Sequence, residues 1–362
     1  MTKIATILGA RPQFVKAAPV SRALRQADVE EVLVHTGQHY DANMSSVFFE
    51  ELDIPEPKHH LGIGSGSHGK QTGRMLEAIE QVLLDERPDW VLVYGDTNST
   101  MAGVLAAAKL NIPVAHVEAG LRSFNRRMPE EQNRIVADHL ATLLFAPTET
   151  AVAHLRHEGI AEGKIDLCGD VMFDAARMFA VRAESVSHVL EDFGLTAGGY
   201  CLATVHRAEN TDVPDRLAAI LDGLALLAAE REVVLPLHPR TRALLDDRRL
   251  AALSDVGVRI VDPLGYLDTV MLEKHAAVVA TDSGGMQKEA FFYNVPCVTL
   301  RDETEWGELI ELGWNRLCTP SSSEQVVAAI RAALGSKGRD GAPYGDGDAA
   351  SKLVRRLLGV AA

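Results

Sequence analysis

The amino-acid sequence predicts an α/β protein of two Rossmann-like, doubly wound domains that face a central cleft. Short apolar runs alternate with helical patterns from end to end, as in parallel strands joined by crossover helices. The alternation pauses once and then resumes, which divides the pattern into two halves. A chain of 362 residues is long enough for two hydrophobic cores.

In the first half, the predicted strands are continuous apolar runs, as expected for strands buried on both faces of a sheet. They are Ile4 to Leu8, Glu31 to His35, Trp90 to Tyr94, Val114 to Val117 and Leu143 to Ala146. Longer segments rich in Ala and Leu lie between them, and helices are expected at Thr97 to Leu110 and Glu131 to Thr142.

The second half repeats the scheme. Its predicted strands are Tyr200 to Thr204, Val233 to Leu237, Val258 to Val261, Ala277 to Ala280 and Pro296 to Thr299. Strand-like runs stop between Gly169 and Leu195, so we expect domains at 1–170 and 171–348. The Gly- and Asp-rich segment Ser336 to Asp348 predicts a mobile loop, and a last amphipathic helix within 349–362 is expected to join the first domain.

Composition excludes several classes of partner. Lys and Arg number 36 against 50 Asp and Glu, and a net charge of −14 argues against nucleic acid or an anionic membrane. No apolar run approaches the roughly 20 residues that span a bilayer, and no signal-peptide pattern is present, so a cytoplasmic location is expected. The four cysteines lack C-x-x-C spacing, which favours buried free thiols over a disulfide or zinc framework. No metal and no cofactor are expected.

The stretch Thr281 to Glu289 follows a predicted strand and runs into a helix. Its Ser283, Gly284 and Gly285 place bare backbone N–H groups at a helix start, which is a ready anion site. Glu289 follows one turn later and can accept hydrogen bonds from a sugar hydroxyl. A phosphate beside a ribose indicates a nucleotide. From this stretch alone, an ordinary glycine-lined turn remains the alternative.

The first strand leads into Gly9-Ala10-Arg11-Pro12. Pro12 suits a helix first turn, and Arg11 and Lys16 supply two cations at its mouth. A surface position is the alternative for Lys16. A dinucleotide-binding domain normally carries G-x-G-x-x-G at this first turn, and its absence disfavours NAD.

Acidic residues follow successive predicted strands. Asp96 comes after Trp90 to Tyr94, with Thr97 as a candidate N-cap, and Glu118 comes after Val114 to Val117. Glu130 and Glu131 open the next helix. Asp96 could be no more than a cap, and Glu131 is best explained by the helix dipole. Several acids at consecutive strand-to-helix junctions nevertheless favour chemistry.

Cations and a histidine follow strands of the second half. His206 can transfer protons near neutral pH, and Arg207 beside it can hold a phosphate. For a lone histidine a structural role would be the better explanation, but the strand-end position favours function. Arg301 adds a cation at the same edge, and His238 is expected as cleft wall without an assigned role.

One motif misleads. Gly64 to Gln71 nearly matches the P-loop pattern, but Gln71 replaces the hydroxyl that would bind Mg²⁺. The preceding Pro57 to His60 is no buried strand. An ATPase is therefore disfavoured, and the glycines better suit a flexible lid over the cleft.

Together these residues resemble the non-hydrolysing UDP-N-acetylglucosamine 2-epimerases. The matching segments span nearly the whole chain and occur in the family's order. They are Gly9-Ala10-Arg11-Pro12, Gly37-Gln38-His39, Gly95-Asp96-Thr97, His116-Val117-Glu118-Ala119-Gly120-Leu121-Arg122, Pro129-Glu130-Glu131-x-Asn133-Arg134, His206-Arg207-x-Glu209-Asn210 and Asp282-Ser283-Gly284-Gly285-x-Gln287-x-Glu289.

The resemblance implies a glycosyltransferase-B-like fold, a homodimer, and interconversion of UDP-GlcNAc and UDP-ManNAc by loss and re-addition of UDP. It assigns proton transfer to a set whose individual steps stay open: Asp96, Glu118, Glu130 and His206. It assigns the UDP-sugar to Arg11, Lys16, Arg207, Ser283, Gly284, Gly285, Glu289 and Arg301. A glycosyltransferase of the same fold and a hydrolysing 2-epimerase remain alternatives.

Two departures from the family pattern concern ligand choice. Some relatives carry a regulatory UDP-GlcNAc pocket near a Gln-His-Arg-x-Met-Leu segment, whereas this chain continues differently after Gln38 and His39. Together with Arg74, these residues form the candidate regulatory pocket. The segment Gly37 to Leu52 also resembles a branch acting on UDP-2,3-diacetamido-glucuronic acid, so the substrate within UDP-2-acetamido sugars stays open.

Overall fold

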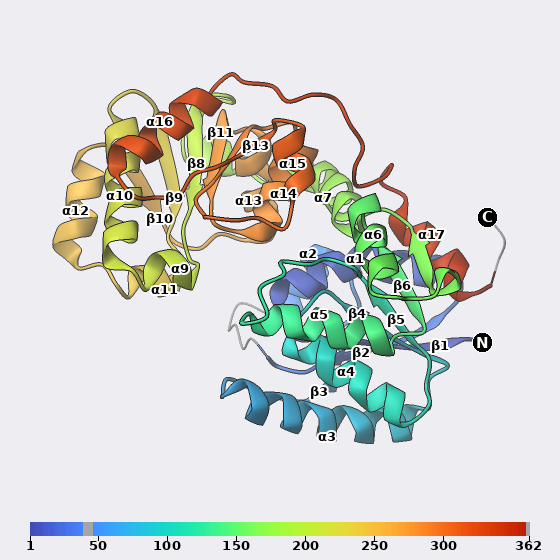
Figure 1. Cartoon of the computed structure of the whole chain (residues 1–362). Coiled ribbons are helices and arrows are strands. Elements are labelled where there is room, and N and C mark those ends of the chain that lie inside the picture. The colour runs from blue at the N-terminus through green and yellow to red at the C-terminus, as the bar shows by residue number, and fades with distance from the viewer. Residues whose placement is uncertain (39–45, 360–362) are drawn as a thin grey trace. The chain divides into compact units, whose positions relative to one another are not determined.

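The computed structural model describes residues 1–38 and 46–359. By its internal contacts the chain divides into two compact units (Figure 1). Unit 1 comprises Met1–Ala175 and Ala342–Ala362, and unit 2 comprises Ala176–Gly341. Each unit is built around one parallel β-sheet with alternating helices, which confirms the predicted α/β class with two doubly wound sheets.

Unit 1 carries a sheet of order β3-β2-β1-β4-β5-β6-β7, in which every recorded pairing is parallel. Its strands are β1 (Lys3–Leu8), β2 (Glu30–His35), β3 (His59–His60), β4 (Trp90–Tyr94), β5 (Val114–Val117), β6 (Leu143–Ala146) and β7 (Ile165–Leu167). Its helices are α1 (Arg11–Gln26), α2 (Ser46–Leu52), α3 (His68–Glu86), α4 (Asn98–Lys109), α5 (Pro129–Leu140), α6 (Glu149–His157), a short 3₁₀ turn (Glu162–Lys164) and α17 (Ala349–Leu357).

Local sequence explains how helices α1 and α4 of unit 1 begin. Pro12 occupies the first turn of α1, and the side-chain oxygen of Gln13 accepts hydrogen bonds from the backbone N–H groups of Gly9 (2.8 Å) and Ala10 (3.1 Å). Thr97 caps α4 by accepting from the N–H of Thr100, as predicted. These caps fix the turns that follow β1 and β4.

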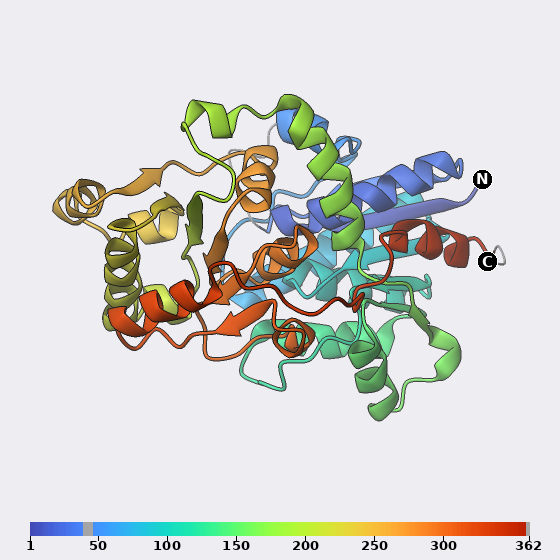
Figure 2. The ribbon, with the colours of Figure 1, turned by 90° about the horizontal axis from the view of Figure 1, so that it is seen from above.

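The C-terminal helix α17 packs against α1 at the surface of unit 1 (Figure 2). Asp174 of α7 (Val171–Val186) accepts hydrogen bonds from the backbone N–H groups of Ala349 (3.2 Å) and Ala350 (2.9 Å). The N–H of Asp170 donates to the carbonyl of Tyr344 (3.0 Å). The last segment of the chain is therefore anchored to unit 1 through backbone groups at the start of α17.

Unit 2 carries a sheet of order β10-β9-β8-β11-β12-β13, again with parallel pairings. Its strands are β8 (Tyr200–Thr204), β9 (Glu232–Pro236), β10 (Val258–Val261), β11 (Val278–Thr281), β12 (Cys297–Thr299) and β13 (Asn315–Leu317). After α7, its helices are α8 (Val189–Asp192), α9 (Ala208–Thr211), α10 (Pro214–Ala228), α11 (Pro239–Arg242), α12 (Asp247–Asp255), α13 (Tyr266–Lys274), α14 (Gly284–Phe292), α15 (Gly307–Glu311) and α16 (Ser323–Ala333).

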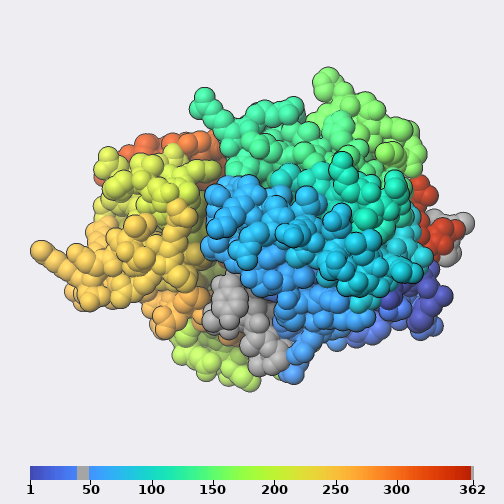
Figure 3. Space-filling model, turned by 90° about the horizontal axis from the view of Figure 1, so that it is seen from below, coloured from blue at the N-terminus to red at the C-terminus, as the bar shows by residue number. Residues whose placement is uncertain are grey.

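Short edge strands are the main difference from the predicted fold. Strands β3, β7 and β13 have only two or three residues, and none is fully buried, so they leave too little apolar pattern to be recognised. The segment before the P-loop-like glycines holds only β3, a partly exposed edge strand. The long helix α3 that follows has a largely exposed outer face, within the blue surface of Figure 3.

Candidate active site

Most predicted site residues follow the strands at which each sheet reverses its order, whereas Glu118 and Glu130 follow β5 and Arg301 follows β12. In unit 1 the reversal falls between β1 and β4, and in unit 2 it falls between β8 and β11. Open α/β sheets bind ligands beyond the carboxyl ends of the strands at these switch points.

In unit 1, Glu118 forms a buried ion pair with Lys16. Lys16 projects from α1, and its Nζ contacts Oε2 of Glu118; the two side chains are 16% and 6% exposed. Lys16 is therefore not a surface lysine. Arg11 is the first residue of α1, so α1 carries both predicted cations.

The turns after β4 and β5 place Glu118 against Gly95, the residue that precedes Asp96. Gly95 and Glu118 adopt the left-handed conformation, with φ of +60° and +69°. A Cβ at Gly95 would lie 3.2 Å from Oε2 of Glu118 and 3.5 Å from Nζ of Lys16. The glycine thus leaves room for the Glu118 carboxylate beside the Asp96 turn, where a side chain would crowd it.

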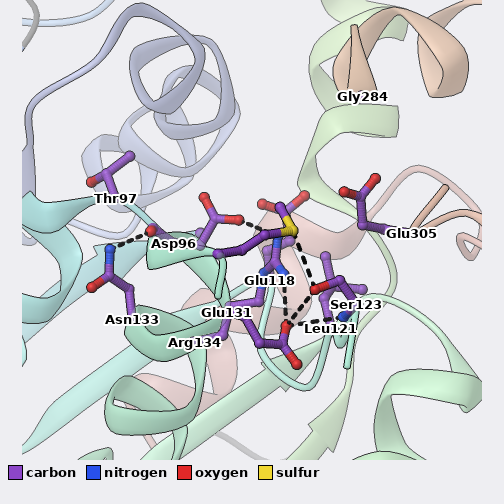
Figure 4. Close-up of polar contacts among 12 residues, drawn as sticks. Asp96, Thr97, Glu118, Leu121, Ser123, Glu131, Asn133, Arg134, Gly284 and Glu305 are labelled. Carbon is purple, nitrogen blue, oxygen red and sulfur yellow. Dashed lines mark hydrogen bonds and ion pairs between the residues drawn. The ribbon is translucent and has the colours of Figure 1, made fainter. Parts of the chain in front are cut away.

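Asp96 pairs with Arg134, a residue to which we assigned no role from the sequence. Nη2 of Arg134 lies 2.5 Å from Oδ2 of Asp96, and Nδ2 of Asn133 donates to the backbone carbonyl of Asp96 at 2.8 Å (Figure 4). The side chain of Asp96 is 31% exposed, so a ligand can reach it. Arg134 follows Glu130 by four residues on one helix, and that spacing could have identified it.

Glu131 does more than interact with the helix dipole, which was the role predicted for it from the sequence. Its carboxylate accepts from the N–H of Ser123 (2.9 Å) and pairs with Arg134 at 2.9 Å (Figure 4). It also accepts from the N–H of Phe124 at 3.0 Å. Burial alone would raise the pKa of Glu131, but these hydrogen bonds and Arg134 bring it below the usual value. Glu131 therefore holds the loop before α5, while Glu130 lies half-buried at the first turn of α5.

In unit 2, the buried carboxylate of Asp282 organises the turn after β8. It accepts from the backbone N–H groups of His206 and Arg207 and from Nδ2 of Asn210, all at 3.0 Å. Asp282 is fully buried, so these donors compensate the cost of burying its charge. The ends of β8 and β11 are thereby joined through one side chain.

His206 lies in a largely buried environment against a second histidine. Its ring stacks on His238, with centroids 5.1 Å apart and planes at 29°. Burial lowers the pKa of His206 below its ordinary value, and the charge of Asp282 opposes this. His238, Arg207 and Arg240 lower it further. The structure therefore places His238 against the ring of His206, a contact that the sequence did not predict.

The start of α14 has the features expected of an anion site. Gly284 is its first residue, and a Cβ there would lie 3.6 Å from Nη2 of Arg207, so a guanidinium sits beside the helix N-terminus. The Ser283 hydroxyl makes no capping hydrogen bond. Nε1 of Trp306 donates to the carbonyl of Gly284 (2.9 Å) and holds this turn from the other side.

Glu289 points back toward the same helix start. Its Oε1 accepts from the Tyr266 hydroxyl at 2.8 Å, and its Oε2 lies 3.9 Å from the position of a Cβ at Gly285. The side chain is 8% exposed. A carboxylate fixed beside an anion site can accept from a sugar hydroxyl next to a phosphate.

Arg301 is wholly buried rather than displayed at the sheet edge. Its guanidinium forms two contacts with the Glu305 carboxylate, at 3.1 and 3.2 Å, and Nε lies 3.6 Å from Glu209. Burial would lower the pKa of Arg301, but Glu305 and Glu209 raise it above its usual value. Its proposed contact with substrate stays a prediction.

The candidate regulatory residues do not all fall in the described part of the chain. The side-chain oxygen of Gln38 accepts from the N–H (2.9 Å) and hydroxyl (2.6 Å) of Ser99, while Arg74 is exposed on α3. His39 lies outside the described residues. Gln71, in the P-loop-like segment, donates to the carbonyl of Gly64 at 3.2 Å. The regulatory pocket stays a prediction.

Residues 1–38 and 46–359 contain neither a metal-binding cluster nor a membrane-spanning helix. No group of three His, Cys, Asp or Glu side chains within these ranges is arranged to hold a metal ion. No helix within them is both long and apolar enough to cross a bilayer.

The fold and these two groups of residues define a class, namely enzymes with two Rossmann-like sheets that act on nucleotide sugars. The family model for UDP-N-acetylglucosamine 2-epimerase matches residues 22–358. The chain belongs to this family, whose members are isomerases.

Individual relatives agree with this assignment. Over 361 residues the chain is 51% identical to UDP-2,3-diacetamido-2,3-dideoxy-D-glucuronate 2-epimerase of Pseudomonas aeruginosa, with 98% of this chain and 99% of the relative covered. It is 45% identical over 361 residues to UDP-N-acetylglucosamine 2-epimerase of Methanocaldococcus jannaschii, with 98% of each chain covered. The crystal structure of a Methanocaldococcus jannaschii UDP-GlcNAc 2-epimerase with UDP-GlcNAc and UDP superposes with a TM-score of 0.90, at 44% identity, covering 99% of this chain and 100% of that one.

Proposed function

We propose that this enzyme inverts C2 of a UDP-2-acetamido sugar by expelling UDP from C1 and adding it back. The observation that carries this is the Lys16–Glu118 pair beside the Asp96–Arg134 pair, at the ends of β4 and β5. The C2–H bond is not next to a carbonyl, so simple deprotonation would be too slow. Loss of the C2 proton together with the C1 oxygen leaves a C1=C2 double bond and bound UDP. A proton then returns to the other face of C2, and UDP re-adds at C1.

The nucleotide part is assigned to unit 2 together with Arg11 of unit 1. The start of α14 and the Arg207 guanidinium provide positive charge for the leaving pyrophosphate, and Arg11 is the second cation proposed for it. Glu289, oriented by Tyr266, is proposed to bind the ribose hydroxyls. These groups hold UDP while it is detached from the sugar.

Proton transfer is assigned to the three acids of unit 1 and to His206 as a set. Glu118 lies beside Lys16 and Asp96 lies beside Arg134, and each is proposed to accept a proton as a carboxylate. Glu130 adds a half-buried carboxyl group at the start of α5. His206, with its depressed pKa, is neutral near pH 7 and also able to accept a proton.

The sugar is proposed to be N-acetylglucosamine, with N-acetylmannosamine as its epimer, or a 2,3-diacetamido-glucuronic acid. The two relatives reported above act on these two kinds of UDP-sugar according to their names. Nuclear magnetic resonance of reactions in D₂O with a panel of UDP-sugars decides between them. Deuterium should appear at C2 of the true substrate, and no incorporation with any member would contradict the proposal.

The same reactions separate the two alternative functions. Free UDP released in proportion to sugar would favour a hydrolysing epimerase. Sugar transfer to an added acceptor, with no isomerisation in its absence, would favour a glycosyltransferase.

The proposal includes a homodimer in the cytoplasm. The four cysteines are buried free thiols, which suits a reducing compartment. Light scattering coupled to size-exclusion chromatography measures the assembly directly; a monomeric mass at working concentration would contradict the dimer.

A further inference from the structure

A buried histidine joins the two turns that carry Asp96 and Glu118. His116 in β5 is 0% exposed, with Nδ1 2.7 Å from Oδ1 of Asp138 in α5 and Nε2 2.7 Å from the carbonyl oxygen of Gly95. The second oxygen of Asp138 accepts from Nη1 of Arg122 at 2.7 Å and from the N–H of Gly120 at 3.1 Å. His116 therefore lies between two acceptors.

These contacts determine the protonation of the ring. A backbone carbonyl can only accept, so Nε2 of His116 must carry a proton. Asp138 is a carboxylate that only accepts, because its second oxygen faces two donors, the Arg122 guanidinium and the N–H of Gly120. Nδ1 of His116 must therefore carry a proton as well. With both nitrogens protonated, His116 is an imidazolium.

The charges around His116 balance. Arg122 also forms two hydrogen bonds of 2.7 Å with Glu158, which reaches the surface with 23% of its side chain exposed. Two cations therefore face two carboxylates. A buried network with no net charge and with its charges hydrogen-bonded avoids the large cost of an unpaired buried ion.

The turns that the network holds are conformationally demanding. Gly95, Glu118 and Gly120 all have positive φ. A Cβ at Gly120 would lie 2.5 Å from the carbonyl oxygen of Ala151, so no other residue fits there. For Glu118 the left-handed conformation is unfavourable and persists only when its surroundings impose it. His116 fixes the carbonyl of Gly95, and Asp138 fixes the N–H of Gly120, on either side of the catalytic candidates.

We propose that His116 and Asp138 are positioning residues, a buried imidazolium–carboxylate pair that holds the turns after β4 and β5 so that Asp96 and Glu118 face C2 of the sugar. The proposal rests on the catalytic role assigned above to those two acids. Neither positioning residue touches substrate; they act through the backbone of the turns.

Nitrogen NMR of histidine-labelled enzyme tests the protonation state without reference to activity. At the pH of the activity assay, His116 should show two protonated ring nitrogens because both face acceptors, with Asp138→Asn used to assign its signals. A neutral His116 in the wild-type enzyme would overturn the proposal.

Two substitutions at Asp138 separate hydrogen bonding from charge. In Asp138→Asn, the amide N–H can donate to Nδ1 of a neutral His116 while the amide oxygen accepts from Arg122 and Gly120. Every hydrogen bond survives, so kcat should stay within about threefold of wild type while His116 becomes neutral. Asp138→Leu removes the hydrogen bonds, and kcat should fall about 100-fold with KM nearly unchanged.

Glu158→Gln is the matched control, because it alters the network at the surface without touching His116. Its kcat and the His116 signals should match those of wild type. A folded Asp138→Leu enzyme with unchanged kcat would overturn the positioning role. If that variant does not fold, the NMR comparison decides, since an imidazolium that persists in Asp138→Asn also contradicts the proposal. A wild-type enzyme inactive on every UDP-sugar would instead refute the proposed function and leave the NMR result intact.

Discussion

At the scale of single residues, the site depends on how each acid is paired. Glu118 lies against Lys16, and Asp96 lies against Arg134, whereas Glu131 serves the backbone of a loop. The acids that occur together in the sequence therefore have different roles in the structure. Substitution of each one should give a distinct result.

Glu118→Gln should lower kcat by about 10²- to 10⁴-fold, because a carboxylate that transfers a proton is lost. UDP affinity should change little, since Glu118 is not among the residues assigned to the nucleotide. Calorimetry with UDP and an NMR assay measure the two effects. Glu77→Gln, at an exposed position of α3, is the matched control. Turnover equal to that of the control would remove Glu118 from the proton-transfer set.

His206 should set the acid limb of the pH profile of kcat/KM. Its pKa is lowered, so it loses its proton-accepting form only below the pH at which an ordinary histidine titrates. Activity should therefore fall as pH drops through that lowered pKa. His238 contributes to the lowering, so His238→Gln should move the limb to higher pH. An unmoved limb would show that His206 does not control it.

Glu289→Gln should weaken UDP binding at least about tenfold, because a carboxylate bound to ribose hydroxyls is a strong acceptor. A UDP analogue without the two ribose hydroxyls should bind wild type and variant equally. Calorimetry with both ligands tests this. Equal losses for both nucleotides would mean that Glu289 supports the fold of the site rather than the ribose.

At the scale of elements, the sequence predicted the central strands to within one residue, because they are continuous apolar runs. Strand β9, for example, is displaced by one residue from its predicted range. The edge strands β3, β7 and β13 were not predicted, because their few residues form no continuous apolar run. Positions at strand ends were predictable as well, but pairings such as Lys16 with Glu118 were not, since they join residues 102 apart.

The N-terminus of α17 should make the stability of unit 1 depend on pH. Burial raises the pKa of Asp174 to about 6, against the hydrogen bonds it accepts from Ala350 and Ala349. A carboxyl group whose folded pKa exceeds its unfolded value stabilises the fold most below the unfolded pKa and loses that contribution as pH rises through about 6.

Asp174→Asn keeps an acceptor for α17 and cannot titrate, so its melting temperature relative to wild type should rise between acidic and neutral pH. Thermal unfolding at several pH values measures the difference. The exposed Asp340→Asn should show no such trend. A constant difference for Asp174→Asn across the range would contradict the account.

At the scale of the whole molecule, the proposed site residues are divided between two sheets of the same architecture. Unit 2 offers a helix N-terminus with Arg207, and unit 1 offers paired carboxylates. The sequence predicted both groups because each follows a buried strand. The burial of Arg301 against Glu305 was not predictable. The sequence pattern around a cation at a strand end is the same whether its side chain faces solvent or a neighbouring acid.

The central claim is that UDP leaves the sugar and returns within one turnover. The most direct test places a heavy-oxygen label in the bridge between C1 and the β-phosphorus and follows it by phosphorus NMR during epimerisation in D₂O. Departure of UDP frees the β-phosphate to rotate, so the label should spread to non-bridging positions while deuterium enters C2. Deuterium at C2 with the label still entirely in the bridge would contradict the elimination.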